Sequence, residues 1–261
     1  MKNAIAIIIG LIFAVSPVLA EDTGAEEKAN KLGVELDATW VSKYIWHGQD
    51  LYNGRAAFQP SVTFDLFGSG FSTGVWKSSA CSSGFVKDEE LDYWAAYGNS
   101  LFEGRRFKTD YEVKWLYYDY FRQSSKKADC EEIEGSFSWP DVLPFGVVPS
   151  YTLSYVYCAH GHCEAADLKM EGFLHTFGIT YDFNAPKVDL PLTFSWDIAY
   201  NDGQGSCNFD HEWAYTTWGL SSYIEFGPGG FTPAIYYQKT MDKSINEEDE
   251  LWCSFSYTVK F

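Results

Sequence analysis

The sequence has no apolar run after Leu19 that approaches the length of a transmembrane helix, which argues against a helical membrane domain beyond the N-terminus. It also lacks a phosphate-binding loop and a dinucleotide fingerprint, so we expect no cofactor. Basic residues are scarce: 19 Lys and Arg stand against 36 Asp and Glu, for a formal net charge of −17. A chain this acidic is a poor partner for nucleic acid, and we expect none to bind.

The N-terminus has the pattern of a bacterial secretory signal peptide. Lys2 precedes an apolar run, and Val18-Leu19-Ala20 forms a small-residue cleavage pattern. An uncleaved anchor helix is the alternative, but the run is short and is interrupted by Pro17. The sequence therefore predicts a signal peptide at residues 1–20, a flexible charged periplasmic tail at 21–32 and one folded domain at 33–261.

Alternation of apolar and polar residues with a period of two is the clearest pattern that the sequence does contain. In "VELDATWVSKYIWHG", every second residue from Val34 to Trp46 lies on a mainly apolar face, and Glu35 and Asp37 begin the opposite, polar face. Twelve such segments can be drawn, at residues 34–48, 55–67, 71–79, 91–99, 105–119, 131–139, 147–157, 172–182, 191–201, 212–223, 231–238 and 250–261. The sequence therefore predicts an all-β protein of about twelve strands.

The connections between these segments alternate between short and long. Short ones such as "FGSG" at 67–70 and "GPGG" at 227–230 are separated by longer ones such as "YFRQSSKKADCE". This pattern is typical of a transmembrane, antiparallel, up-and-down β-barrel of the outer membrane. An even number of strands places both termini on the short-turn, periplasmic side. A soluble β-sandwich with an aromatic core is the alternative.

The aromatic residues, 18% of the chain, fit two membrane interfaces. One predicted belt lies at the loop ends of the strands and comprises Tyr44, Trp46, Tyr117, Tyr155, Tyr157, Tyr200 and Tyr237. The other lies beside the short turns and comprises Phe64, Phe67, Phe71, Tyr181, Phe226 and Phe231.

The chain ends in an alternating segment, "SFSYTVKF", whose apolar face needs a partner. We expect this last strand to close the barrel against the first, which pairs its edge and turns its apolar face to lipid. Phe255, Tyr257 and Phe261 resemble the C-terminal assembly signal of Gram-negative outer-membrane proteins. That resemblance implies the barrel-assembly machinery, outer-membrane lipid and lipopolysaccharide as partners.

The stretch "VSKYIWHGQDLYNGRAAFQPSVTFDLFGSGFSTGVWKSSA", followed by "ELDYWAAYGNS", resembles the opening of the TorF-type porin family. That family begins with a "VSDYIFRGxSxTxxxPAxQxxxDY…GFYxGxW" pattern, and His47 stands where the pattern has arginine. The resemblance covers about the first third of the mature chain. It implies an outer-membrane barrel that passes small solutes, and it implies no catalytic residues.

The polar face of the predicted strands defines a lumen in which acids outnumber bases. The inward acids are Glu35, Asp37, Asp65, Asp92, Asp110, Glu112, Glu132, Glu134, Asp182 and Asp197. The inward bases are Lys43, Arg55, Lys108, Lys114 and Lys260. The long loops and their flanks are acidic as well, with Glu90 and Glu250 among their acids. Acidic rings in a narrow, low-dielectric wall concentrate cations and repel anions.

These charges favour a porin-like outer-membrane channel for passive diffusion of small, preferentially cationic or neutral solutes. A salt-bridged, plugged interior is the alternative, and it corresponds to a non-conducting barrel whose disulfide-braced loops serve adhesion or envelope structure. An outer-membrane hydrolase is a remoter alternative. His175 lies between Phe173 and Phe177 without a serine nucleophile, and Asp210 with His211 is the only adjacent acid–histidine pair at the loop rim. We therefore expect no enzymatic activity.

The chain contains six cysteines, and an even number in an exported protein predicts disulfides. Cys158 and Cys163 flank one loop and are the pair most easily closed. The remaining candidates, without a fixed connectivity, are Cys81 with Cys130 and Cys207 with Cys253.

The stretch "CAHGHCE" also has the residue types of a zinc site, because His160 and His162 lie between two thiols. Periplasmic oxidation competes for those thiols, and the spacing fits no standard zinc finger. A disulfide is therefore the favoured interpretation and a metal the alternative.

We expect non-reducing mass spectrometry of the exported protein to find a peptide that links Cys158 to Cys163, because the two thiols flank one short loop in an oxidising compartment. Zinc found by elemental analysis, with both thiols free, would favour the metal site instead.

Overall fold

A computed structural model describes residues 31–160, 171–185, 190–204 and 211–261 of the chain. Helix is almost absent from these residues: α1 (Ser125–Ala128) and the 3-10 helices η3 (Val86–Asp88) and η4 (Pro144–Gly146) are single turns. No helix among the described residues is long and apolar enough to cross a membrane. The predicted signal peptide and nearly all of the predicted tail lie outside the described residues.

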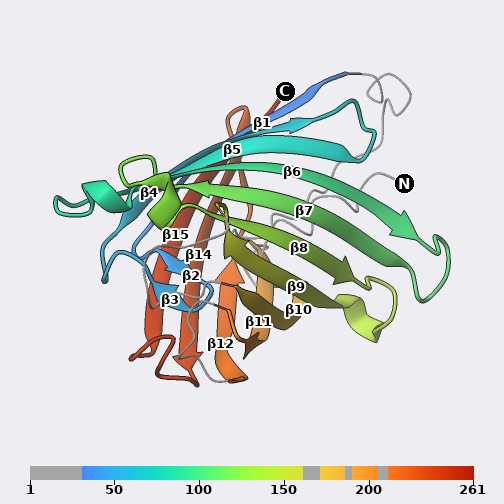
Figure 1. Cartoon of the computed structure of the whole chain (residues 1–261). Coiled ribbons are helices and arrows are strands. Elements are labelled where there is room, and N and C mark those ends of the chain that lie inside the picture. Colours follow the sequence, from blue (N-terminus) through green and yellow to red (C-terminus); the bar gives the residue numbers. More distant parts are fainter. Residues whose placement is uncertain (1–30, 161–170, 186–189, 205–210) are drawn as a thin grey trace.

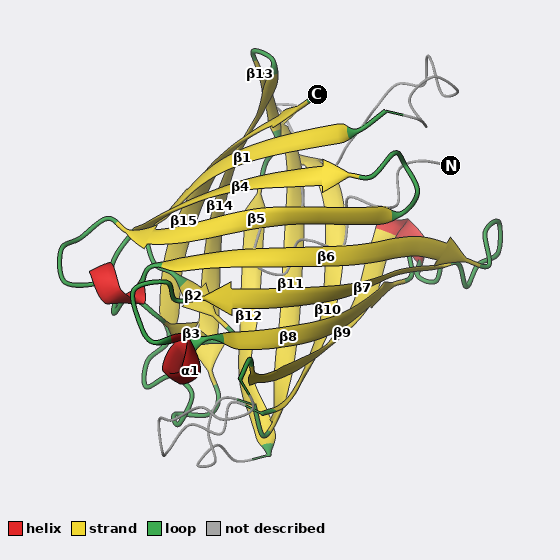
Figure 2. Cartoon of the chain, turned by 45° about the horizontal axis from the view of Figure 1, so that its top comes forward, coloured by secondary structure: helices red, strands yellow, loops and turns green. Residues whose placement is uncertain are grey.

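Twelve strands form one closed antiparallel wall, in which each strand pairs with its neighbours in the chain. They are β1 (Gly33–Val41), β4 (Ala57–Asp65), β5 (Phe71–Ala80), β6 (Glu90–Leu101), β7 (Thr109–Asp119), β8 (Cys130–Ser138), β9 (Val147–Cys158), β10 (Gly172–Ala185), β11 (Leu190–Asp202), β12 (Glu212–Ser221), β14 (Gly229–Thr240) and β15 (Glu250–Lys260). The short strands β2 (Ile45–Trp46) and β3 (Gln49–Asp50) pair with each other, and β13 (Ile224–Phe226) extends the hairpin before β14. Figures 1 and 2 show the curved wall, with the start of β1 and the C-terminus near one end.

The wall closes where the first and last strands meet. β1 pairs with β4 on one side and with β15 on the other, while β12 pairs with β14. At the very end of the chain, the Phe261 amide donates to the Val34 carbonyl over 2.9 Å. No wall strand is therefore left with an unpaired edge, and the predicted β-barrel with about twelve strands is confirmed.

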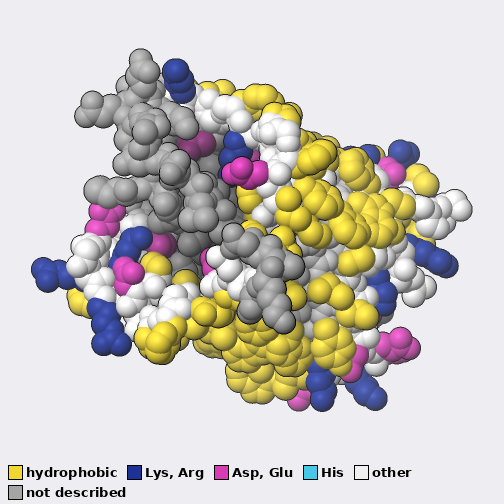
Figure 3. Space-filling view, turned by 180° about the vertical axis from the view of Figure 1, so that it is seen from behind, with side chains coloured by type: hydrophobic (Ala, Val, Ile, Leu, Met, Phe, Trp, Pro, Cys, Tyr) yellow, Lys and Arg dark blue, Asp and Glu magenta, His cyan; other side chains and the backbone are white. Residues whose placement is uncertain are grey.

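Side chains alternate between the two faces of the wall, with the apolar ones outside. Val113, Ile235 and Leu251 are 51%, 51% and 59% exposed on the outer face. On the inner face, Gln59 and Ser78 are only 1% and 0% exposed. Figure 3 shows broad hydrophobic patches on the outer surface. This arrangement is the inverse of a water-soluble sandwich and is suited to a lipid surrounding.

The first predicted segment is wrong beyond Val41, where β1 ends. Tyr44, Ile45 and Trp46 are all buried, at 3%, 9% and 7% exposure. Ile45 and Trp46 form β2, which pairs with β3 in a separate two-stranded sheet and not with a wall strand, so this segment has left the wall. The sequence had suggested that Tyr44 and Trp46 belong to the aromatic belt at the loop ends of the strands. The structure instead places both side chains inside the barrel.

We expect Gly74→Ala to lower the free energy of unfolding by about 1–3 kcal/mol, the usual range for overpacking. A Cβ atom on Gly74 would lie 2.5 Å from the Val62 carbonyl oxygen and 2.7 Å from the Trp94 ring. Gly135→Ala is the matched control, because its nearest neighbour, Phe137, would be 3.8 Å away. Urea unfolding of the detergent-folded protein measures both; equal midpoints would contradict the tight packing at Gly74.

Candidate functional site

A short hairpin from the loop between β1 and β4 lies inside the barrel. We call residues 44–50, which contain β2 and β3, the plug. Its turn passes through His47 and Gly48, which have positive φ values of 47° and 86°. β2 and β3 lie near the end of the barrel that carries α1 (Figure 2).

Aromatic contacts hold the plug against the inner face of the wall. Its Tyr44 ring lies 5.7 Å from the Trp76 ring, and its Trp46 ring lies 5.6 Å from the Tyr118 ring. Tyr44 and Trp46 belong to one buried cluster with inward residues of several wall strands. Burial raises the pKa of the Tyr44 phenol well above its usual value, so its hydroxyl stays protonated and donates to Glu90 over 3.0 Å.

Hydrogen bonds from the opposite side of the barrel fix the tip of the plug. The Gly48 carbonyl accepts from the Gln238 side chain at 2.8 Å and from the Asn246 side chain at 3.1 Å. Gln204 Nε2 lies 2.6 Å from His47 Nδ1. A Cβ atom on Gly48 would be 2.7 Å from Tyr215 Cε1, so the Tyr215 ring packs directly on this glycine. The plug therefore bridges the lumen from one wall to the other.

The wall formed by β6, β7 and β8 is acidic. Asp92, Glu112 and Glu132 are 5%, 4% and 1% exposed, and Lys114 is the base nearest to them on these strands. The Tyr118 hydroxyl donates to Glu132, and His47 Nε2 lies 3.6 Å from the other oxygen of that carboxylate. Glu112 Oε1 and Asp92 Oδ1 have no hydrogen-bond partner among the described residues. Buried carboxylates without full pairing attract cations or water.

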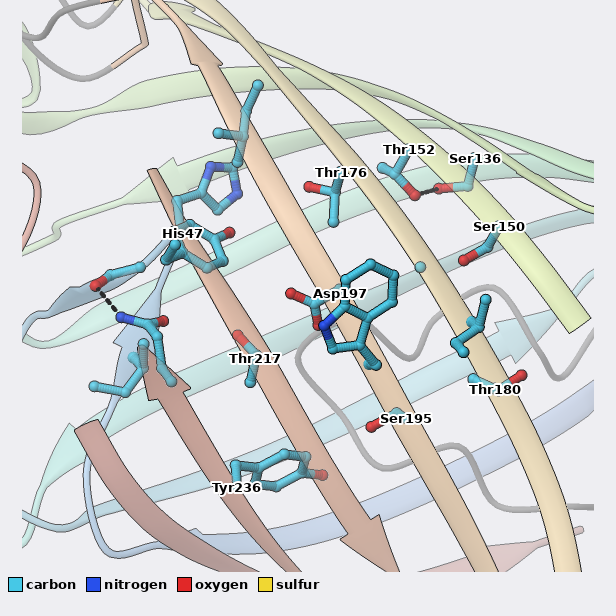
Figure 4. Close-up of a pocket in the computed structure, with 18 of the residues that line it drawn as sticks. His47, Ser136, Ser150, Thr152, Thr176, Thr180, Ser195, Asp197, Thr217 and Tyr236 are labelled. Carbon is cyan, nitrogen blue, oxygen red and sulfur yellow. Dashed lines mark hydrogen bonds between the residues drawn. The ribbon is translucent and has the colours of Figure 1, made fainter. Parts of the chain in front are cut away.

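A partly open cavity of about 160 Å³ lies beside the plug, between β8 and β15, and is lined mostly by hydroxyl and aromatic side chains. Its lining hydroxyl residues are Ser136, Ser138, Ser150, Ser154, Ser195, Ser221, Thr152, Thr176, Thr180, Thr193 and Thr217. Figure 4 shows Asp197, Thr217, Ser195 and Tyr236 around this space, with His47 of the plug at its edge. The carboxyl groups of the lining are Glu134 and Asp197, and no lysine or arginine lines it among the described residues.

Most of the predicted lumen residues face the interior. Glu35, Asp37, Asp92, Asp110, Glu112, Lys114 and Asp197 lie at inward positions of the wall strands. Lys43 and Lys108 lie just outside the strands, where they pair with Glu250 at 2.6 Å and Asp110 at 3.1 Å.

Two predicted lumen residues do not line the interior. Arg55 is exposed in the loop before β4, because that strand begins only at Ala57. Asp65 is exposed at the end of β4, where its carboxylate accepts the Gly68 amide and caps the turn.

The sequence interpretation also missed inward residues. Glu90 and Glu250, assigned to the loops, are 1% and 5% exposed inside the barrel. Trp94, Tyr236 and Trp252 also point inward. The sequence does contain a sign of their direction, because each of these aromatic residues lies two positions from an inward polar residue. The sequence interpretation used aromatic residues only for the two membrane interfaces.

The cysteines depart from the expected pattern. Cys81, Cys130 and Cys253 are free thiols, so the suggested Cys81–Cys130 and Cys207–Cys253 bridges are not formed. Cys130 is buried in the lumen whereas Cys81 is exposed in a loop, which keeps the two apart. Cys158 is not one of the free thiols, and Cys163 lies outside the described residues, so their link stays a prediction.

Three described histidines contact different partners. His175 lies on the outer face, where its Nδ1 is 2.8 Å from the Tyr151 hydroxyl. His211 contacts Asp202 instead of Asp210, which lies outside the described residues together with His162. Within the described residues, no group of three or more His, Cys, Asp or Glu side chains is arranged to hold a metal ion.

Comparison with known proteins supports the porin-like fold. A family model described as "Bacterial protein of unknown function (Gcw_chp)" matches residues 25–250. The chain is similar to the KdgM porin, with a TM-score of 0.51 and 11% identity over 87% of this chain and 98% of that one. It is similar to the NanC porin, with a TM-score of 0.50 and 11% identity over 87% and 100% of the two chains. No curated protein sequence matches, and the TorF-type resemblance is not confirmed.

We expect Gly48→Ala to loosen the plug, because the new methyl group would overlap the Tyr215 ring. Gly54→Ala is the matched control: Gly54 also has a positive φ, of 72°, but its new Cβ would meet only Asp50, at 3.9 Å. Hydrogen–deuterium exchange of residues 44–50 should rise in Gly48→Ala well beyond the control. Equal exchange in the two variants would show that Tyr215 does not hold the plug.

Proposed function

We propose that this chain, which belongs to the Gcw_chp family of bacterial proteins of unknown function, is an outer-membrane channel for small cationic or neutral solutes. The apolar outer face supports insertion into lipid, and the paired first and last strands support a barrel stable in a membrane. Export by the predicted signal peptide, delivery by the barrel-assembly machinery and contact with lipopolysaccharide belong to this proposal.

The main support for cation preference is that acidic residues outnumber basic residues on the inner face of the barrel. Lys114 faces Asp92, Glu112 and Glu134, so one base stands among several carboxylates on the acidic wall. The other lysines predicted to line the lumen each pair with one carboxylate: Lys260 with Glu35 at 2.8 Å, Lys43 with Glu250 at 2.6 Å and Lys108 with Asp110 at 3.1 Å. A narrow lumen with this balance favours cations over anions.

The plug favours a second candidate, a barrel that does not conduct. Its aromatic cluster fills part of the loop end of the lumen, and its tip is hydrogen-bonded to the far wall. A non-conducting barrel would have a structural or adhesive role in the envelope. The two candidates differ in one measurable property, the passage of ions through the purified protein in a bilayer.

We expect planar-bilayer recording to show a small conductance whose reversal potential across a potassium chloride gradient indicates cation preference. Glu112→Gln should lower the potassium-to-chloride permeability ratio several-fold, because a nearby full charge interacts with a passing ion by about 1 kcal/mol or more. The preference should weaken as salt rises.

Glu247→Gln is the matched control, since Glu247 is exposed in the loop between β14 and β15 and is screened by solvent. Anion preference in the unmodified protein would overturn the electrostatic basis of the proposal. A silent bilayer with correctly folded protein would favour the non-conducting barrel.

A further inference from the structure

Two aromatic rings form a flat surface on one side of the cavity. Tyr236 of β14 is directly opposite Trp252 of β15 in the strand register, and their ring centroids are 5.2 Å apart with an interplanar angle of 20°. Both side chains point into the cavity and are partly exposed there. Aligned rings of this kind offer an apolar face to a ligand inside an otherwise polar lumen.

A glycine on the neighbouring strand makes room for this surface. Gly219 of β12 lies opposite Tyr236, and a Cβ atom on it would be 2.9 Å from both Tyr236 Cδ1 and Cε1. The Tyr236 ring therefore lies against the Gly219 backbone instead of standing across the lumen. The same Cβ position would also overlap the Ser195 hydroxyl, so the ring and this hydroxyl meet over Gly219.

Polar groups lie beside the two rings in the next row of the wall. Asp197 is two residues from Ser195 on β11, and it is opposite Thr217 of β12. Thr217 is in turn opposite Gln238, two residues from Tyr236. Figure 4 shows Asp197, Thr217, Ser195 and Tyr236 around one opening. One carboxyl group and several hydroxyl groups thus lie next to one aromatic surface.

The charge and size of the cavity limit what it can bind. Among the described residues that line it, Asp197 and Glu134 carry carboxyl groups and none is a lysine or arginine, so an anionic ligand would be repelled. Its volume of about 160 Å³ is similar to that of a cavity of about 150 Å³ that holds one benzene molecule. Because the cavity is partly open, it suits a single six-membered ring whose substituents extend into the lumen.

We propose that this cavity is a binding subsite for a protonated single-ring amino sugar. The ammonium group pairs with Asp197, the ring hydroxyls exchange hydrogen bonds with Ser195 and Thr217, and the C–H face of the sugar stacks on Tyr236 and Trp252. A charge-assisted hydrogen bond and an aromatic contact then act together on one ring. The subsite would determine which solutes the proposed channel holds, but binding itself does not require conduction.

Calorimetric titration of the detergent-folded protein with glucosamine, glucose and gluconate tests the proposal. We expect glucosamine to bind more tightly than glucose and gluconate not to bind. Asp197→Asn should weaken glucosamine binding about tenfold, the effect of losing one charge-assisted hydrogen bond, and should weaken glucose binding much less. Tyr236→Leu should weaken both sugars.

Asp141→Asn is the control, because it removes the same charge from an exposed short turn outside the cavity. Equal affinity of the unmodified protein for glucosamine and glucose, or an Asp197→Asn variant that binds glucosamine normally, would overturn the subsite. Glucosamine binding together with a silent bilayer would support the subsite while the proposed channel fails. Cation conductance without any glucosamine binding would support the proposed channel and overturn the subsite.

Discussion

The closure of the strand ladder is the constraint on which the rest of the structure depends. Inside a lipid layer no water can pair with a free backbone amide or carbonyl, so every strand needs a neighbour on both sides. Pairing of β1 with β15 and of β12 with β14 meets this need without any helix. Once the wall is closed, the pleat sends alternate side chains outward and inward. The apolar exterior and the polar interior then follow from the period of two in the sequence.

That division leaves the protein with a large number of polar groups to satisfy inside a narrow space. Some are paired along one strand or between neighbouring strands, because Asp37 accepts hydrogen bonds from Thr39 of β1 and Thr258 of β15. Others are satisfied by the plug, whose Tyr44 hydroxyl and Gly48 carbonyl reach opposite walls. The plug therefore fills the loop end of the lumen with packed side chains, as a hydrophobic core fills a soluble domain. It supplies aromatic packing and hydrogen bonds at the loop end of the barrel.

The wall could be predicted from the sequence because its physical signal is local and repeated. Alternation assigned Asp92, Glu112 and Asp197 to the interior, and short turns fixed the order of the strands. The plug could not be predicted, because Ser42, Tyr44 and Trp46 continue the alternation of β1 although the chain has left the wall. The plug differs from the wall strand β1 in its contacts with residues far away in sequence, such as Gln238 and Asn246. Inward rings such as Trp252 were missed for a related reason: burial against Tyr236 is a tertiary property, whereas aromatic character alone favours an interface.

The interior is divided between two chemically different walls. Carboxylates are concentrated on β6, β7 and β8, while hydroxyl groups and the Tyr236–Trp252 pair are concentrated between β8 and β15. The plug spans the two, because His47 lies near Glu132 on one side and Gly48 is bonded to Gln238 on the other. In the proposed channel, an ion and a ring-shaped solute would thus meet different surfaces. Because the plug contacts both walls, its packing and hydrogen bonds limit the space beside each of them.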